Sequence, residues 1–192
     1  MTERLCPAWA GYFLANRLRM LLQNPYKIVA PYVREGMTVL DFGSAMGFFS
    51  LRMAKIVGPE GKVVCVDVQP KMLRVLRGRA AEAGLSQRME IHLSSENSIG
   101  LKGCENRFDF ALAFAVMHEV EDPARILAEI HTSLKDGAPL LLAEPRGHVS
   151  ASEFERTIAL ALAAGFVDTA HPEIRLSHAV ILTKAAGQAE KQ

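Results

Sequence analysis

The sequence predicts an α/β protein built on a doubly wound, seven-stranded mixed sheet. Three observations lead to this fold class. Apolar runs of strand length alternate with segments of helical period. Two early runs carry an acid at or near their ends, and a loop with two glycines follows the first run. Alternation of this kind implies crossovers between parallel strands, with helices on both faces.

The first half of the chain supplies three strands and two helices. The strands are expected at Thr38–Phe42, Lys62–Asp67 and Met89–Leu93. Phe48–Val57 carries apolar residues on one helical face. Pro70–Ala83 has the same spacing and stops at Gly84, a residue typical of helix ends.

The second half supplies four strands and two helices. The strands are expected at Phe108–Ala115, Leu140–Ala143, Phe166–His171 and Ala179–Lys184. One helix begins at Asp122-Pro123, with the acid as N-cap, and runs to about Leu134. The other is Ser152–Ala164, capped by Ser150 or Ser152. The last two strands have no helix between them, so they can pair as a hairpin and give one antiparallel strand.

The loop after the first strand is the first place to look for a ligand. Ligands of doubly wound sheets bind beyond the carboxyl ends of the strands, where the strand order reverses. Gly43 and Gly47 allow a tight turn and close approach of the backbone to a ligand. The helix that follows directs free N–H groups into the crevice, which favours a nucleotide-like ligand. The alternative is an ordinary connection without a ligand.

An acid at the end of the second strand strengthens the ligand hypothesis. Asp67 lies 24 positions after Gly43 and is placed to accept hydrogen bonds from both ribose hydroxyls of an adenosine. The alternative is that Asp67 only caps the helix that starts at Pro70.

The loop does not match the dinucleotide fingerprint. That pattern would need glycines at positions 43, 45 and 48, where the chain has Gly43, Ala45 and Phe48. The match is Asp-x-Gly-x-x-x-Gly, which begins at Asp41 inside the first strand. An acid beside the loop suits a cationic ligand group better than a pyrophosphate.

The chain resembles the class I S-adenosylmethionine-dependent methyltransferases at three places. These are the stretch Asp41–Gly47, the acid Asp67, and the run from Phe108-Asp109 to Met117-His118-Glu119-Val120. The likeness spans about Tyr32 to Lys184 and is greatest to the small-molecule group named methyltransferase type 11, or ubiquinone-biosynthesis-like. It implies a Rossmann-like sheet in the order 3-2-1-4-5-7-6, with strand 7 antiparallel. It also implies methyl transfer from S-adenosylmethionine to a small molecule.

The resemblance also assigns cofactor-binding residues. Asp41 and Gly43 line the methionine end, Asp67 takes the ribose hydroxyls, and Val68 and Met72 flank the adenine. The family often has Gly-Asp-Ala after strand 3, where this chain has Ser94-Ser95-Glu96, so either Ser95 or Glu96 takes the adenine contact. The remaining members of the predicted cofactor set are Ser44, Ala45, Gly47 and Phe114. The methyl group of Ala45 restricts positive φ angles and is expected to lower cofactor affinity without excluding the cofactor.

Candidate catalytic residues follow strands 4 and 5. His118 and Glu119 come directly after strand 4, where a histidine can act as a base or merely orient the loop. Glu144 ends strand 5, and His148 follows it, which puts an acid and a base over the crevice. The alternative for this second pair is a solvated loop that caps the next helix.

The N-terminal segment leaves three readings open. Residues 1–35 place Trp9, Tyr12 and Phe13 before Arg17, Arg19 and Lys27. The segment is a lid over the substrate, with Tyr12 as a catalytic candidate, or plain core packing, or an interfacial helix that touches a membrane. We expect a single domain, with the cofactor-binding core at 36–185 and a tail at 186–192.

Composition excludes several other classes. The formal net charge is +1 and there is no basic patch or appended recognition domain, which argues against a nucleic-acid partner. Three widely spaced cysteines indicate a reduced, cytoplasmic protein with no metal site: Cys6, Cys65 and Cys104. We expect a monomer or a homodimer. Two other functions stay open: a non-catalytic protein that binds the adenosyl ligand, and an NAD(P)-dependent oxidoreductase.

Overall fold

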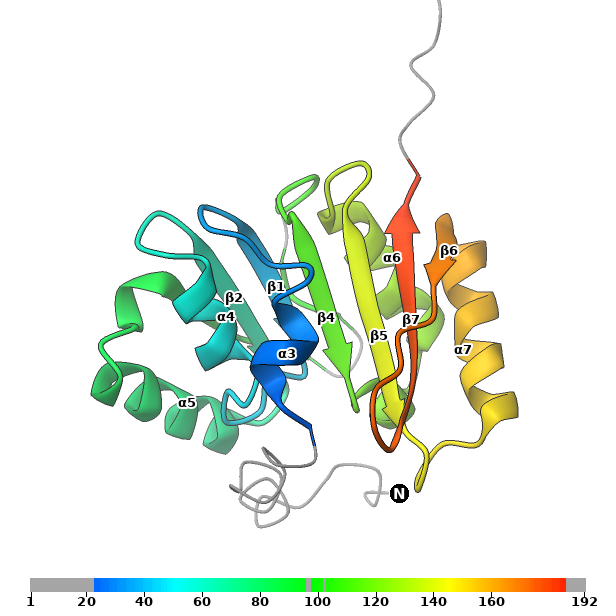
Figure 1. Ribbon diagram of the computed structural model, residues 1–192, viewed down its shortest axis with the longest axis horizontal. Helices are drawn as coiled ribbons and strands as arrows, with labels where there is room; N and C mark the ends of the chain where they lie inside the picture. The colour runs from blue at the N-terminus through cyan, green and yellow to red at the C-terminus, as the bar shows by residue number, and fades with distance from the viewer. Residues whose placement is uncertain (1–22, 96–97, 102, 186–192) are drawn as a thin grey trace, which may run out of the picture.

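The computed structural model describes residues 23–95, 98–101 and 103–185 (Figure 1). Two predicted site residues, Tyr12 and Glu96, lie outside these ranges. Most of the predicted N-terminal lid and the whole of the predicted tail also fall outside them.

A single seven-stranded sheet in the order β3-β2-β1-β4-β5-β7-β6 runs through the described residues. Its strands are β1 (Thr38–Phe42), β2 (Lys62–Asp67), β3 (Met89–Leu93), β4 (Phe110–Phe114), β5 (Pro139–Pro145), β6 (Phe166–Ala170) and β7 (Ser177–Lys184). The first five are parallel to one another, and β7 is antiparallel to both β5 and β6. The predicted fold class, strand order and antiparallel strand are therefore confirmed.

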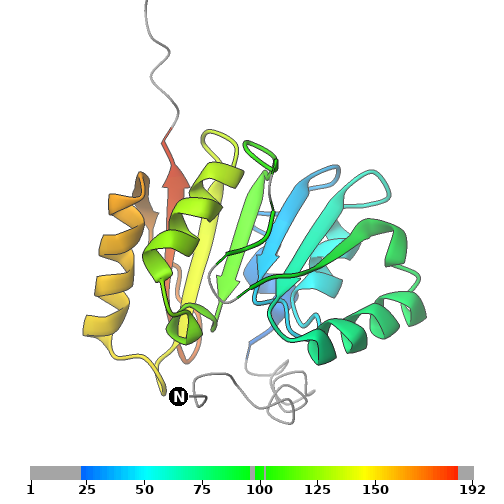
Figure 2. The same ribbon diagram turned by 180° about the vertical axis from the view of Figure 1, so that it is seen from behind.

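Helices cover both faces of the sheet, as a doubly wound fold requires (Figures 1 and 2). They are α3 (Pro25–Val29), α4 (Ser50–Ile56), α5 (Pro70–Glu82), α6 (Pro123–Ser133) and α7 (Ala151–Ala163), with short 3-10 turns η1 (Ser86–Arg88) and η2 (Met117–Glu119). The buried residues of α3, α4 and α5 join one core cluster, and those of α6 and α7 join the other. The sheet is thus buried between two apolar layers.

The central strands are apolar on both faces for this reason. All five residues of β4 are buried, and β1 is buried from Val39 to Phe42. An acid in such a strand loses its hydration, so Asp41 needs a partner or a proton. The carboxyl ends of β4 and β5 point to the same edge, the lower one in Figure 1.

Several predicted element boundaries were wrong by one or two residues, and the backbone explains two of these differences. The helix expected from Phe48 begins at Ser50, because the left-handed backbone of Gly47, at φ +82°, keeps the chain in a turn before the helix can start. Strand β4 ends at Phe114, since Ala115 turns the chain with φ +56°.

The predicted helix caps are confirmed. Asp122 accepts a hydrogen bond from the Arg125 N–H at 3.1 Å. Ser150 and Glu153 form a reciprocal capping box at the start of α7.

Candidate active site

Every second residue in the loop after β1, from position 43 to 47, has a left-handed backbone conformation. Gly43, Ala45 and Gly47 have φ angles of +73°, +44° and +82°. The Gly43 and Ser44 N–H groups donate to the Val66 carbonyl at 2.9 and 3.0 Å, which ties the loop to β2. A Cβ on Gly43 would overlap with the side chain of Val116, so glycine is needed there for space as well as for conformation.

Asp67 holds this loop and the start of α5 together. Its Oδ2 accepts from the Ala45 N–H at 2.8 Å, and its Oδ1 accepts from the Gln69 N–H at 2.8 Å. Gln69, the N-cap of α5, makes no side-chain cap bond of its own. The helix-cap reading of Asp67 therefore has structural support, but it does not exclude the ribose reading. Each carboxylate oxygen can accept a second hydrogen bond.

Ala45 takes the conformation that glycine normally takes. Its φ of +44° is strained for a residue with a Cβ, at a cost of order 1–2 kcal/mol. The bond from its N–H to Asp67 helps to hold it there. Ala45 thus takes a left-handed conformation at the position where the family pattern has its middle glycine.

Asp41 lies beneath the loop and is 3% exposed. It accepts a hydrogen bond from Ser50 Oγ at the start of α4. The pKa of Asp41 is raised from 3.8 to about 7: burial is the largest cause, the hydrogen bond from Ser50 opposes it, and the nearby charge of Asp67 adds to it. Burial likewise raises the pKa of Asp67. Two acids whose charge is incompletely compensated favour a cation at this edge.

A buried hydroxyl without a partner marks the same loop. Ser44 is 5% exposed, and its Oγ finds no hydrogen-bond partner in the described part of the chain. Ser94 Oγ, directly after β3, is likewise a buried atom with no hydrogen-bond partner among the described residues. A buried polar atom without a partner costs about 1–3 kcal/mol, which a polar ligand would recover. The residues present therefore fit a polar, cationic adenosyl ligand such as S-adenosylmethionine.

The predicted adenine-side residues surround the start of α5 and the end of β3. Val68 is half-buried and Met72 is 4% exposed. Ser95 is exposed and forms an isolated bridge with Ser98. Phe114, at the end of β4, packs against Phe49 with ring centroids 4.6 Å apart.

On the other side of the crevice, His118 pairs with Glu144. Glu144 lies near the end of β5, and His118 follows the adjacent strand β4; Nδ1 of His118 lies 2.5 Å from Oε2 of Glu144. The other carboxylate oxygen, Oε1, accepts from the Met117 N–H at 2.7 Å. The Glu144 side chain is only 2% exposed, whereas the His118 side chain is 28% exposed. Sequence reasoning placed Glu144 over the crevice without identifying its partner.

The charges around His118 alter its basicity. Burial lowers the pKa of His118, but the Glu144 hydrogen bond and the charges of Glu144 and Glu119 raise it by more, so the pKa is raised overall. His118 Nε2 lies 3.9 Å from Glu119 Oε1, which is too far for a direct hydrogen bond.

His148 lies near this pair without bonding to it. Its ring is stacked on that of His118 with centroids 6.1 Å apart, and the residue is exposed. Three predicted catalytic residues therefore gather at one place: His118, Glu119 and His148.

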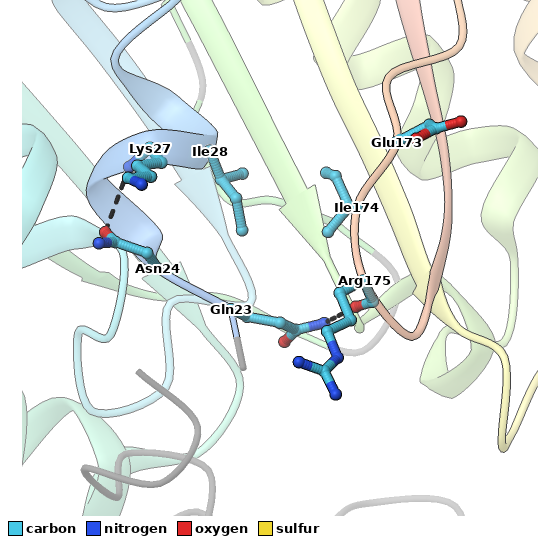
Figure 3. Close-up of a pocket in the computed structure, with 7 residues that line it drawn as sticks. All are labelled: Gln23, Asn24, Lys27, Ile28, Glu173, Ile174 and Arg175. Atoms are coloured by element: carbon cyan, nitrogen blue, oxygen red, sulfur yellow. Dashed lines mark hydrogen bonds between the residues drawn. The ribbon is translucent and has the colours of Figure 1, made fainter. Parts of the chain in front are cut away.

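A hollow of about 260 Å³ opens between α3 and the loop from β6 to β7 (Figure 3). Ile28 and Ile174 lie on opposite sides of it (Figure 3). Gln23 crosses one end, where its amide donates to the Arg175 carbonyl at 2.8 Å. Sequence reasoning missed this hollow, because its walls come from segments about 150 positions apart.

Comparison with known proteins decides the family. A family model described as a methyltransferase domain matches residues 33–178. The chain belongs to this family. It is 33% identical over 140 residues to the ubiquinone/menaquinone biosynthesis C-methyltransferase UbiE of Hahella chejuensis, covering 70% of this chain and 55% of that protein.

Two further relatives agree with this assignment. The demethylmenaquinone methyltransferase of Listeria monocytogenes is 33% identical over 108 residues, which is 56% of this chain and 44% of that protein. The chain thus spans about half the length of the curated relatives it matches. A solved S-adenosylmethionine-dependent methyltransferase from Aquifex aeolicus has a TM-score of 0.84 at 26% identity, covering 94% of this chain and all of that one.

The resemblance inferred from the sequence is therefore confirmed, and family and fold imply S-adenosylmethionine as the cofactor. No helix in the described part of the chain is long and apolar enough to cross a membrane. In the same residues, no group of three or more histidine, cysteine or acidic side chains could hold a metal ion.

Proposed function

We propose that this protein transfers a methyl group from S-adenosylmethionine to a small-molecule acceptor. The observation that carries the proposal is the loop of Gly43 to Gly47, tied through Ala45 to the Asp67 carboxylate. This arrangement leaves a glycine-lined backbone, an acid with unused lone pairs and the unpartnered Ser44 hydroxyl at one crevice. Family membership supports the same function.

The cofactor residues divide by the part of the ligand they would hold. Asp41, Gly43, Ser44, Ala45 and Gly47 would hold the methionine end. The ribose hydroxyls would bind Asp67. The adenine would lie between Val68 and Met72, with Ser95 or Glu96 at its amino group and Phe114 at the crevice wall.

When bound, S-adenosylmethionine supplies a methyl group that is already electrophilic. The protein then has to orient the acceptor, exclude water and remove a proton where the acceptor carries one. His118 is the residue we assign to the last task, with Glu119 and His148 beside it. Tyr12, on the predicted lid, is the further candidate.

The acceptor is proposed to be small and partly apolar. The names of two relatives point to quinone precursors as their acceptors. A formal net charge of +1 offers little attraction for a nucleic acid. The hollow beside α3 presents two apolar side chains, Ile28 and Ile174, among polar ones.

Several sequence expectations remain proposals. We infer one domain, which the single sheet supports, and a cytoplasmic location, which the free thiols of Cys65 and Cys104 support. The chain is proposed to be a monomer or a homodimer. Contact of the N-terminal segment with a membrane stays a secondary possibility.

Calorimetric titration with S-adenosylhomocysteine tests the proposal, with NADH as the control. Micromolar binding of the first ligand and none of the second is expected. The reverse result would make the loop a dinucleotide site and overturn the reaction class. Binding without turnover of any acceptor would instead favour the non-catalytic binding protein.

A further inference from the structure

We infer that Glu144 is a positioning residue that fixes the His118 imidazole to take a proton from a hydroxyl group of the acceptor. The inference rests on the proposed function, because it concerns the acceptor side of the same site. It also names the acceptor class: a molecule with a weakly acidic hydroxyl, phenolic or enolic.

The Glu144 carboxylate is fixed at both oxygens. Oε1 accepts from the Met117 N–H at 2.7 Å, and Oε2 lies 2.5 Å from His118 Nδ1. The residue is 1% exposed, so water does not compete for these bonds. The backbone beneath is also fixed, since the Ala115 N–H donates to the Ala143 carbonyl at 2.7 Å. The orientation of the carboxylate follows from the pairing of β4 with β5.

This bond selects the tautomer of the imidazole. An ionised carboxylate can only accept, so Nδ1 must carry the proton and the lone pair lies on Nε2. The His118 side chain is 28% exposed, so it can meet a ligand. A buried carboxylate also stabilises the imidazolium that forms when Nε2 takes a proton.

The pair stands close to the loop assigned to the cofactor. Val116, two residues before His118, lies so close to Gly43 that a Cβ there would overlap with its side chain. The His118 turn and the cofactor loop are therefore packed against each other. A base on this turn therefore lies beside the loop assigned to the cofactor.

The proton step is simple. The acceptor O–H bond breaks, its proton moves to His118 Nε2, and the electron pair stays on the acceptor oxygen. The oxygen, or a ring carbon conjugated to it, becomes the nucleophile and takes the methyl group as the donor's S–CH₃ bond breaks. When the carbon is methylated, its hydrogen then leaves as a proton and the ring becomes aromatic again. The imidazolium then returns the proton to water.

A purely structural role of Glu144 would need only the bond to Met117. Glu144→Gln separates the two roles, because the amide oxygen still accepts from the Met117 N–H while its NH₂ group faces His118. That NH₂ group donates to Nδ1 and forces the proton onto Nε2. The tautomer of His118 is thus inverted with little change in side-chain volume.

Nitrogen NMR of isotope-labelled histidine imidazoles measures the tautomer of His118 directly, in the protein without cofactor or acceptor. We expect the Nδ1–H tautomer for His118 in the parent protein and the Nε2–H tautomer in Glu144→Gln, with a lower pKa because a charge-assisted bond is lost. His118→Asn identifies the signal. The groups that face His118 are Glu144, Glu119 and His148, so the titration is repeated in Glu119→Gln and His148→Asn.

Turnover provides the second readout, with 1,4-naphthalenediol and catechol as acceptors. Glu144→Gln should lower kcat at least tenfold and leave S-adenosylhomocysteine affinity within twofold. The acidic limb of the pH profile should move to lower pH. Glu144→Asp, which keeps the charge, should recover part of the rate.

A surface pair supplies the matched control. Asp168 Oδ2 lies 3.0 Å from His171 Nε2, and the His171 side chain is 60% exposed. Asp168→Asn should change the imidazole NMR signals of His171 alone and leave turnover unchanged.

An unchanged tautomer and pKa of His118 in Glu144→Gln would overturn the inference, whether or not either acceptor is methylated. A loss of S-adenosylhomocysteine affinity as large as the loss of kcat would also overturn it, because Glu144 would then hold the cofactor loop. Failure of the parent protein to bind S-adenosylhomocysteine would instead remove the proposed function, and the two failures are distinguishable.

Discussion

The two sides of the crevice are built in different ways. On the β1–β2 side, the contacts come from the backbone: three residues with positive φ, and N–H groups that donate to Val66 and Asp67. On the β4–β5 side, the contacts come from side chains, with Glu144 holding His118 at 2.5 Å. The first side is specified by a local turn and the second by the register of two strands.

This difference suggests a division of tasks. A backbone cradle binds by shape, and any added Cβ disturbs it. A side-chain pair can change its protonation state while the backbone stays in place. We therefore expect substitutions on the first side to affect binding and substitutions on the second to affect turnover.

The largest effect is expected at Gly43. Gly43→Val should weaken S-adenosylhomocysteine binding by about 100-fold or more, equivalent to about 2.8 kcal/mol. The added side chain would meet Val116 and would also strain a residue at φ +73°. Calorimetry measures the affinity.

Gly137→Val is the matched control, since Gly137 has φ +76° with nothing within 4 Å of an added Cβ. It should reduce the melting temperature and leave the affinity unchanged. A folded Gly43→Val protein with normal affinity would remove this loop from the cofactor site.

Asp67→Ala should weaken the same ligand at least about tenfold, because hydrogen bonds to a charged acceptor are worth about 1.5–3 kcal/mol each. It should also lower stability, as the Ala45 and Gln69 N–H groups lose their acceptor.

Asp109→Ala separates the two effects. Asp109 accepts from the Thr38 N–H at 2.8 Å, at the start of β1 and away from the crevice. Its loss should lower stability without changing affinity. Equal affinity in both variants would leave Asp67 as a helix cap alone.

Asp41→Asn should change how stability depends on pH. Burial raises the pKa of Asp41 from 3.8 to about 7, so the folded protein binds this proton more tightly than the unfolded chain. Its contribution to the free energy of unfolding is therefore largest below about pH 4 and falls as the pH rises towards 7. The variant lacks this dependence, so its melting temperature relative to the parent should be higher at pH 8 than at pH 5. An equal difference in melting temperature between variant and parent at both pH values would contradict the raised pKa assigned to Asp41.

The smallest effect is expected from Ala45→Gly and Ala115→Gly, one on each side of the crevice. Both alanines have positive φ, at +44° and +56°. Relief of strain is offset by the greater freedom of glycine in the unfolded chain, so stability should change by no more than about 1 kcal/mol. Only Ala45→Gly should raise cofactor affinity, by about threefold. An equal rise in both would show that the two turns act as one unit.

Much of the fold could be predicted because its signals are local. The bounds of β1, β2 and β3 follow from apolar runs that turn residues interrupt. The start of α4 could not be predicted, since Phe48 and Phe49 fit the apolar period of the helix although the turn at Gly47 excludes them from it.

The site shows the same limit. The glycine loop and Asp67 could be picked out as candidates from their spacing in the sequence alone. The pairing of Glu144 with His118 joins residues 26 positions apart, and only the register of β4 with β5 brings them together. Spacing could not show that Asp67 serves both as a cap for α5 and as an acceptor for Ala45.

The order of strands in the sheet has a consequence for synthesis on the ribosome. β7 lies between β5 and β6, so β6 is translated before the strand to which it pairs. Until Ser177–Lys184 emerges, the nascent chain presents the open edge of β5 and an unpaired β6. Open edges of this kind can pair with other chains. β6 can therefore join the sheet only after β7 has paired with β5.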